Sequence, residues 1–191
     1  MIYVIGDGGL GREVKCYIES TGEIAELVGP QSRLSDDDLL AMAQPDVVIA
    51  VGDPALRREL ARKFAGRVVF KNIFAGSVQR HSIRRLGRGC VFAPGVRLTT
   101  GIEIGNHIHF NLNVTVGHDT IIHDYCVINP GANISGRVTL GEGVLVGTGA
   151  CIRDGVSVGK NAVIGMGAVV VKNVPAGMTV AGNPARELRR G

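Results

Sequence analysis

The sequence is poor in aromatic residues: it has no tryptophan, and only 4% of its 191 residues are aromatic. Its core must therefore be built from aliphatic side chains. Proteins that bind single-stranded nucleic acid combine basic tracks with stacking aromatic rings. Here the basic residues are scattered and the net charge is only +4. We therefore expect no nucleic-acid partner and consider small anionic ligands a better match.

Long hydrophobic runs are also missing. No apolar segment approaches the length of a membrane-spanning helix, and residues 1–5 lead into a glycine loop without the segments of a signal peptide. The four cysteines show no metal-ligand spacing, and Cys90 and Cys126 fall at compact positions of a repeat. We expect a cytoplasmic protein with no membrane partner and no metal.

What the chain does have is a period of six. From Leu86 to Val170 every sixth residue is apolar, without a missed step. Neither an amphipathic helix nor an alternating strand has this period, whereas a fixed short repeat is typical of a β-solenoid. The pattern predicts regular coils from about Leu86 to Val171. The repeated apolar residues are Leu86, Phe92, Leu98, Ile104, Phe110, Val116, Ile122, Ile128, Ile134, Leu140, Val146, Ile152, Val158, Ile164 and Val170.

Residues 1 to about 70 instead alternate strand and helix signals, which predicts a small unit of parallel strands and crossover helices. A short apolar strand precedes the loop Gly6-Asp7-Gly8-Gly9-Leu10-Gly11. Its glycines match G-x-G-x-x-G, which favours a nucleotide or phosphate cradle at a helix N-terminus. A tight structural turn is the alternative, since the second half of a dinucleotide-binding fold is missing.

A nucleotide-binding-like unit followed by hexad repeats resembles the sialic-acid O-acetyltransferase and nucleotide-amino-sugar N-acetyltransferase family, which belongs to the hexapeptide-repeat acyltransferases. The residues that carry the resemblance are 6–11, 49–53 with Arg57, 111–136 and the tail 180–185.

The resemblance implies a mainly β fold: a left-handed parallel β-helix preceded by a small α/β, Rossmann-like unit. It divides the chain into a nucleotide-sugar-binding unit (1–72), an acetyl-CoA-binding β-helix with a C-terminal cap (73–185) and a basic tail (186–191). It also implies a homotrimer with active sites between subunits.

The same resemblance assigns the catalytic base to His118, oriented by Asp119. An imidazole can accept a proton near neutral pH. Gly136 follows 18 residues later, one coil on, and neighbouring strands lie about 4.8 Å apart. We therefore expect a position without a side chain beside the imidazole, where a backbone N–H is able to face a ligand or an oxyanion.

Further roles come from the resemblance alone. It implies that Gly8, Gly9, Leu10, Gly52 and Asn111 bind the acceptor substrate, and that Gly136, Thr148 and Met166 bind acetyl-CoA. Lys160, Lys172 and Arg186 are candidates for the coenzyme A phosphates.

The other histidines compete with His118. His123 also precedes an aspartate, but it falls at a turn position where we expect a solvated corner or a subunit contact. His107 and His109 flank Ile108, and we expect them to line the same cleft from a neighbouring subunit. His81 precedes the regular coils.

These features predict an acetyltransferase that moves the acetyl group of acetyl-CoA to the amine of a nucleotide-linked amino sugar. The resemblance implies a role in surface-glycan synthesis or protein glycosylation. O-acetylation of a sialic-acid-like sugar or of serine, and a non-catalytic protein that binds sugar nucleotides, are the alternatives. Leu10, Val28-Gly29-Pro30 and Val127 depart from the family pattern, which leaves the sugar and the nucleotide open.

Overall fold

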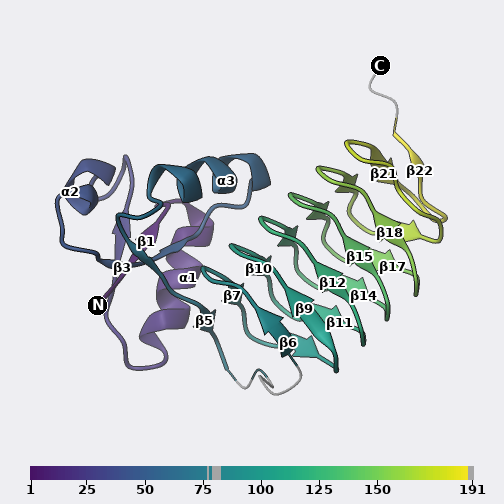
Figure 1. Ribbon diagram of the computed structural model, residues 1–191, viewed down its shortest axis with the longest axis horizontal. Coiled ribbons are helices and arrows are strands. Elements are labelled where there is room, and N and C mark those ends of the chain that lie inside the picture. The colour runs from purple at the N-terminus through teal and green to yellow at the C-terminus, as the bar shows by residue number, and fades with distance from the viewer. Residues whose placement is uncertain (77, 79–82, 189–191) are drawn as a thin grey trace.

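The computed structural model describes residues 1–76, 78 and 83–188, so His81 lies outside the described residues. A small α/β unit is followed by a long solenoid of short strands (Figure 1). The predicted α/β unit is confirmed, because its four strands form one parallel sheet in the order β2-β1-β3-β4. Its elements are β1 (Ile2–Ile5), α1 (Gly9–Glu19), β2 (Ala25–Val28), α2 (Asp36–Leu40), β3 (Asp46–Ile49), α3 (Pro54–Lys63) and β4 (Val69–Phe70).

Local sequence signals determine where the helices begin. Ser35 caps α2 through a reciprocal capping box with Asp38. Asp53 caps α3 by accepting the Leu56 N–H at 2.7 Å, and Pro54 follows it. By contrast, the N-cap of α1 is Gly8, which makes no side-chain hydrogen bond. The first amides of α1 are therefore not capped by a side chain.

The solenoid is a left-handed parallel β-helix, as predicted. Each coil spans 18 residues, since Phe110 pairs with Ile128 and Ile128 with Val146.

The short strands stack into three parallel faces. The first face contains β5 (Ile73–Phe74), β7 (Val91–Phe92), β10 (His109–Phe110), β13 (Val127–Ile128), β16 (Leu145–Val146), β19 (Val163–Ile164) and β21 (Thr179–Ala181), with the antiparallel β22 (Arg186–Glu187) at its edge. The second contains β8 (Arg97–Leu98), β11 (Thr115–Val116), β14 (Asn133–Ile134), β17 (Cys151–Ile152) and β20 (Val169–Val170). The third contains β6 (Ile83–Leu86), β9 (Ile102–Ile104), β12 (Ile121–Ile122), β15 (Thr139–Leu140) and β18 (Ser157–Val158).

The solenoid begins earlier than the unbroken repeat predicts. β5 pairs with β7, so the first face already starts at Ile73. Phe74 lies twelve residues before Leu86 and is therefore in phase with the hexads. Its ring stacks on Phe92 at a centroid distance of 4.6 Å, and Phe92 stacks on Phe110 at 4.8 Å.

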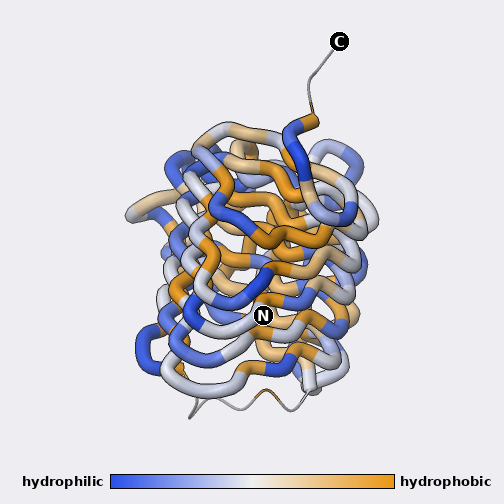
Figure 2. Tube along the Cα trace, turned by 90° about the vertical axis from the view of Figure 1, so that its right-hand side faces the viewer, coloured by the Kyte–Doolittle hydropathy of each residue, from blue (hydrophilic) through white to orange (hydrophobic). Residues whose placement is uncertain are grey.

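The repeated apolar residues form the solenoid core. All of them except Leu86 are at most 5% exposed, and Figure 2 shows apolar positions recurring from coil to coil. Cys90 and Cys126 are buried among them, as expected. Full burial of one such aliphatic side chain contributes about 1.5–3 kcal/mol, so the regular stacking itself stabilises the fold.

The corners between the short strands share a backbone conformation that the hexad pattern did not predict. The third residue after each repeated apolar residue, from Leu86 to Ile164, has a positive φ. This left-handed conformation favours glycine or asparagine. The residues at these corners are Gly89, Gly95, Gly101, His107, Asn113, Asp119, Tyr125, Gly131, Arg137, Gly143, Gly149, Gly155, Asn161 and Gly167.

Stacked corners form three edges, each named here after one member. The His118 edge contains Thr100, His118, Gly136, Asp154 and Lys172. The Met166 edge contains Leu112, Pro130, Thr148 and Met166. The Asn106 edge contains Arg88, Asn106, Asp124, Glu142 and Lys160.

The α/β unit packs against the Asn106 edge and its neighbouring corner residues. Arg58 of α3 pairs with Glu142 at 3.0 Å and lies over the ring of Tyr125, 5.5 Å from its centroid. Phe70 meets His107 edge-on at 4.5 Å. The N-terminal unit therefore covers a different edge from the one that carries His118.

This docking corrects the prediction for two histidines. His107 is 4% exposed and His109 is 0% exposed, so neither lines an open cleft. Burial lowers the pKa of His107 to about 4 and that of His109 to about 3, with the nearby Arg57 cation adding to both shifts. Both side chains are covered within their own chain, and they belong to the interface between its two units.

Candidate active site

His118 lies on an accessible corner immediately after β11. Its Nδ1 lies 2.9 Å from Oδ2 of Asp119, and the two side chains are 45% and 64% exposed. A carboxylate only accepts hydrogen bonds, so this contact assigns the proton to Nδ1. The lone pair of Nε2 is then available to accept a proton.

Gly136 lies against the other side of the imidazole. A Cβ at this position would be 2.6 Å from Nε2 of His118 and 3.0 Å from Oδ2 of Asp154. Among the described residues, the Gly136 N–H has no hydrogen-bond acceptor. The structure thus brings together an imidazole nitrogen and an unpaired amide, and the imidazole occupies the space that a side chain at position 136 would need.

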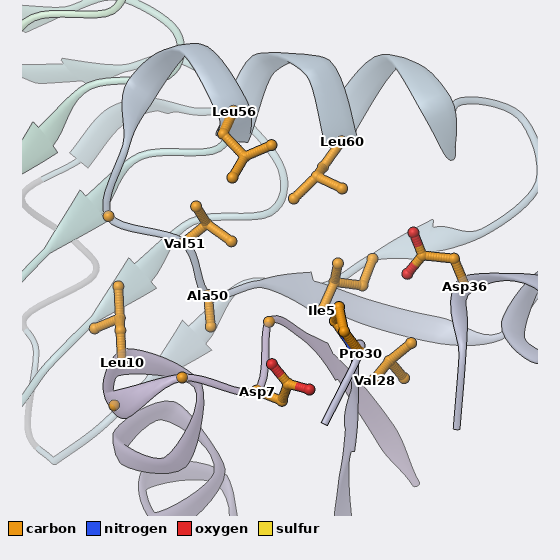
Figure 3. Close-up of a pocket in the computed structure, with 15 residues that line it drawn as sticks. Ile5, Asp7, Leu10, Val28, Pro30, Asp36, Ala50, Val51, Leu56 and Leu60 are labelled. Atoms are coloured by element: carbon orange, nitrogen blue, oxygen red, sulfur yellow. The ribbon is translucent and has the colours of Figure 1, made fainter. Parts of the chain in front are cut away.

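The glycine loop and the end of β3 form a separate cleft of about 480 Å³ (Figure 3). Gly8, Gly9, Leu10 and Gly52 all line it. The departing segment Val28-Gly29-Pro30 lines it as well. The predicted acceptor-binding residues of the α/β unit therefore share one cavity, whose volume suits a small-molecule ligand.

The glycines of this loop have different physical roles. A Cβ on Gly6 would lie 2.7 Å from the Ala50 carbonyl oxygen, and one on Gly11 would overlap the Gly6 carbonyl oxygen at 1.9 Å. These two positions need glycine for packing. Gly8 and Gly9 have no atom within 4 Å of an added Cβ. They leave open space along the cleft, where a ligand is able to approach the backbone.

A buried cation holds the wall of this cleft. Arg57 is 0% exposed and donates to the carbonyl oxygens of Val51 at 3.0 Å and Ile49 at 2.9 Å. A longer bond of 3.5 Å reaches the carbonyl oxygen of His107 in the β-helix. Burial lowers the Arg57 pKa to about 10. Arg57 therefore connects the cleft to the first coils.

The remaining predicted site residues lie apart in a single chain. Thr148 and Met166 are exposed on the Met166 edge, and Asn111 is nearly buried at the end of β10. Lys172 and Arg186 share a second cleft of about 250 Å³ at the C-terminal end. Lys160 is instead paired with Glu142 at 3.4 Å. Lys172 lies on the His118 edge, but three coils beyond His118, and the described chain brings none of the other groups to His118 or to the cleft of the α/β unit.

One cleft residue was missed by the sequence analysis. Asp36 lies at the end of the cleft opposite Leu10 (Figure 3), and its carboxylate pairs with Lys63 at 2.6 Å. In the sequence it looks only like a first-turn acid of a helix. Asp36 follows the loop at the carboxyl end of β2. Because ligands bind at the carboxyl ends of parallel strands, this position could have marked Asp36 as a cleft residue.

Comparison with known proteins agrees with this architecture. Residues 137–172 match the model of the bacterial transferase hexapeptide family (six repeats). The acetyltransferase domain of PglB from Neisseria gonorrhoeae FA1090, solved with acetyl coenzyme A, is 30% identical; the alignment covers 98% of each chain with a TM-score of 0.91. This chain belongs to the hexapeptide-repeat acyltransferases.

Two other members of this family are similar to the chain. A mutant perosamine N-acetyltransferase from Caulobacter crescentus, in complex with CoA and GDP-perosamine, is 26% identical over 99% of this chain and 97% of that one, with a TM-score of 0.92. GDP-perosamine N-acetyltransferase from Escherichia coli O157:H7 is 44% identical over 110 residues, which is 55% of this chain and 50% of the relative. The match therefore spans about half the length of that curated relative.

Within the described residues, no helix is long and apolar enough to cross a membrane. Over the same residues, no group of three or more His, Cys, Asp or Glu side chains has the arrangement of a metal site.

Proposed function

We propose that this protein transfers the acetyl group of acetyl-CoA to the amine of a nucleotide-linked amino sugar. The observation that carries the proposal is the arrangement at His118, whose Nε2 faces the bare Gly136 position while Nδ1 donates to Asp119. The cleft of the α/β unit supports a sugar-nucleotide acceptor, because its glycine loop leaves open backbone beside the N-terminus of α1. Relatives of the chain have been solved with CoA and GDP-perosamine.

The position of the proton in the His118–Asp119 pair determines how the acetyl transfer proceeds. The neutral amine of the sugar attacks the thioester carbonyl carbon, and Nε2 of His118 takes the proton that the nitrogen loses. Asp119 stabilises the resulting imidazolium. The Gly136 N–H is available to the negative oxygen of the tetrahedral intermediate. When the carbon–sulfur bond breaks, the thiolate of coenzyme A leaves and the imidazolium supplies its proton.

The site is completed between copies of the chain in a homotrimer. In one protomer the α/β unit covers the Asn106 edge, whereas His118 lies on another edge and Thr148 and Met166 on the third. Two neighbouring β-helices in the trimer would bring the His118 edge of one copy to the Met166 edge of the next. Such packing accounts for coenzyme A ligands that a single chain keeps apart.

The test is release of coenzyme A thiol from acetyl-CoA, with purified protein and a panel of UDP-, dTDP- and GDP-linked 4-amino sugars. Free sialic acid and serine serve as the acceptors of the rival O-acetyltransferase. Turnover with one sugar nucleotide, lost in His118→Ala, is the expected result. Turnover only with a hydroxyl acceptor would overturn the N-acetyltransferase assignment. Sugar-nucleotide binding without acetyl-CoA binding would instead favour a non-catalytic protein.

A further inference from the structure

The cleft of the α/β unit has two chemically different ends. Gly8, Gly9 and Leu10 lie at one end, beside the N-terminus of α1. Asp36 lies at the other end (Figure 3). A diphosphate favours the uncapped amides of a helix N-terminus. A nucleotide held there by its phosphates therefore extends its base toward Asp36.

The walls between these ends are aliphatic. Val28 and Pro30 line the cleft on the side of β2, and Leu56 and Leu60 line it from α3. A nucleobase has two apolar faces and a polar edge. Such walls cover the faces of any base and do not discriminate among bases. Selection must come from the group that meets the edge.

Asp36 is the group placed to do so. Its Oδ2 pairs with Lys63 at 2.6 Å, while Oδ1 has no partner among the described residues. The other carboxylate of the cleft, Asp7, lies in the glycine loop next to Gly8, and its Oδ2 accepts hydrogen bonds from the Gln31 N–H and the Ser32 hydroxyl. Oδ1 of Asp36 is therefore free to accept a hydrogen bond from the ligand, and Oδ2 keeps a second lone pair beside its contact with Lys63.

We propose that the sugar nucleotide carries guanine and that Asp36 is the residue that selects it. Guanine presents two adjacent donors, N1–H and the exocyclic amino group, which match the two oxygens of a carboxylate. Uracil and thymine present one N–H between two carbonyl oxygens, which repel a carboxylate. Adenine and cytosine place an acceptor nitrogen next to their amino group. This inference rests on the proposed sugar-nucleotide function.

The test measures the affinities of GDP, UDP, dTDP and ADP for the full-length protein by calorimetry. We expect GDP to bind at least about tenfold more tightly than the others, since a site built for donors rejects ligands that lack them. Asp36→Asn places an amide donor at that edge. It should weaken GDP binding by about tenfold or more and leave UDP binding nearly unchanged.

Two variants separate recognition from structure. Asp37→Asn makes the same charge change one residue further along, on an exposed side chain that does not line the cleft, and should leave the GDP preference intact. Lys63→Gln breaks the ion pair but keeps the carboxylate, and should also retain the preference. A purely structural role for Asp36 would weaken all four nucleotides equally.

The outcomes are distinguishable. Equal binding of all four nucleotides, or a GDP preference that survives in Asp36→Asn, would overturn the role of Asp36 and leave the acetyltransferase proposal in place. Tighter binding of UDP or dTDP would do the same. If no nucleotide binds, the sugar-nucleotide acceptor fails, and the guanine inference fails with it.

Discussion

A side chain at position 136 would collide with the imidazole of His118: its Cβ would lie 2.6 Å from Nε2 and 2.7 Å from Cε1. Both residues lie on the same edge, one coil apart, so the regular stacking of the β-helix holds them together. The absence of a side chain at Gly136 is therefore as necessary to the candidate site as the imidazole of His118.

Gly136→Ala should therefore lower kcat by about a hundredfold, the usual cost of moving a catalytic group by about 1 Å. The fold should persist, because the imidazole at an exposed corner is able to turn away. Thiol release measures the loss, and acetyl-CoA affinity and melting temperature serve as controls. In the His118→Ala background the same change should have little further effect. Additive losses would show that Gly136 acts independently of the imidazole.

His118→Ala should lower kcat by about 10²–10⁴-fold, the typical contribution of a general base. Acetyl-CoA binding should be retained. His123→Ala is the matched control, since His123 also precedes an aspartate but lies exposed on another edge. Equal losses in both variants would remove the reason for choosing His118.

Asp119 requires a pair of substitutions, because its φ of +57° penalises most residues. Asp119→Asn keeps a residue that tolerates this backbone but removes the charge. We expect about a ten- to hundredfold loss of kcat, less than in a buried triad, since Asp119 is 64% exposed to screening water. Asp119→Gly relaxes the corner and removes the side chain. Full activity in the glycine variant would exclude an orienting role.

Arg57→Ala should lower the free energy of unfolding by about 3 kcal/mol or more, because several buried carbonyl oxygens lose their donor. Those of Ile49 and Val51 form the closest contacts. Denaturant unfolding measures the effect. Arg62→Ala is the control, since Arg62 is an exposed residue of the same helix, and a change within about 0.5 kcal/mol is expected there. Equal stability of both variants would contradict the role of Arg57 as a connector.

The buried histidines predict acid sensitivity of the interface between the two units. His107 and His109 have folded-state pKa values of about 4 and about 3, below the 6.5 of an exposed histidine. The unfolded chain therefore binds more protons below pH 6.5, and stability falls as the pH drops toward 4. Each histidine contributes a slope of up to about 1.4 kcal/mol per pH unit. His109→Leu should reduce this slope in denaturant unfolding between pH 7 and pH 4.5, and an unchanged slope would contradict the buried, neutral state of His109.

The sequence was sufficient for whatever depends on the period of the repeat. Spacing predicted the solenoid, the positions that form its core and the proximity of Gly136 to His118, because coils of 18 residues stack at one strand spacing. Prediction from the sequence failed where segments that are distant in the chain pack against each other. His107 and His109 occupy positions that ordinarily face outward, and only the docked α/β unit buries them. Asp36 reaches the cleft through the loop after β2, whose course no repeat determines.

The left-handed corners have a consequence of their own. The left-handed backbone of such a corner suits glycine and is tolerated by asparagine and aspartate, whereas most other residues carry a conformational penalty of about 1–2 kcal/mol. Within the described corners, the residues other than glycine and asparagine are His107, Asp119, Tyr125 and Arg137. The first and third lie under the α/β unit, whereas Asp119 and Arg137 flank His118 on successive coils. In proteins of this architecture, the costly corners therefore point to the places where natural selection acted on something other than folding, and they can be found from the repeat phase before any chemistry is known.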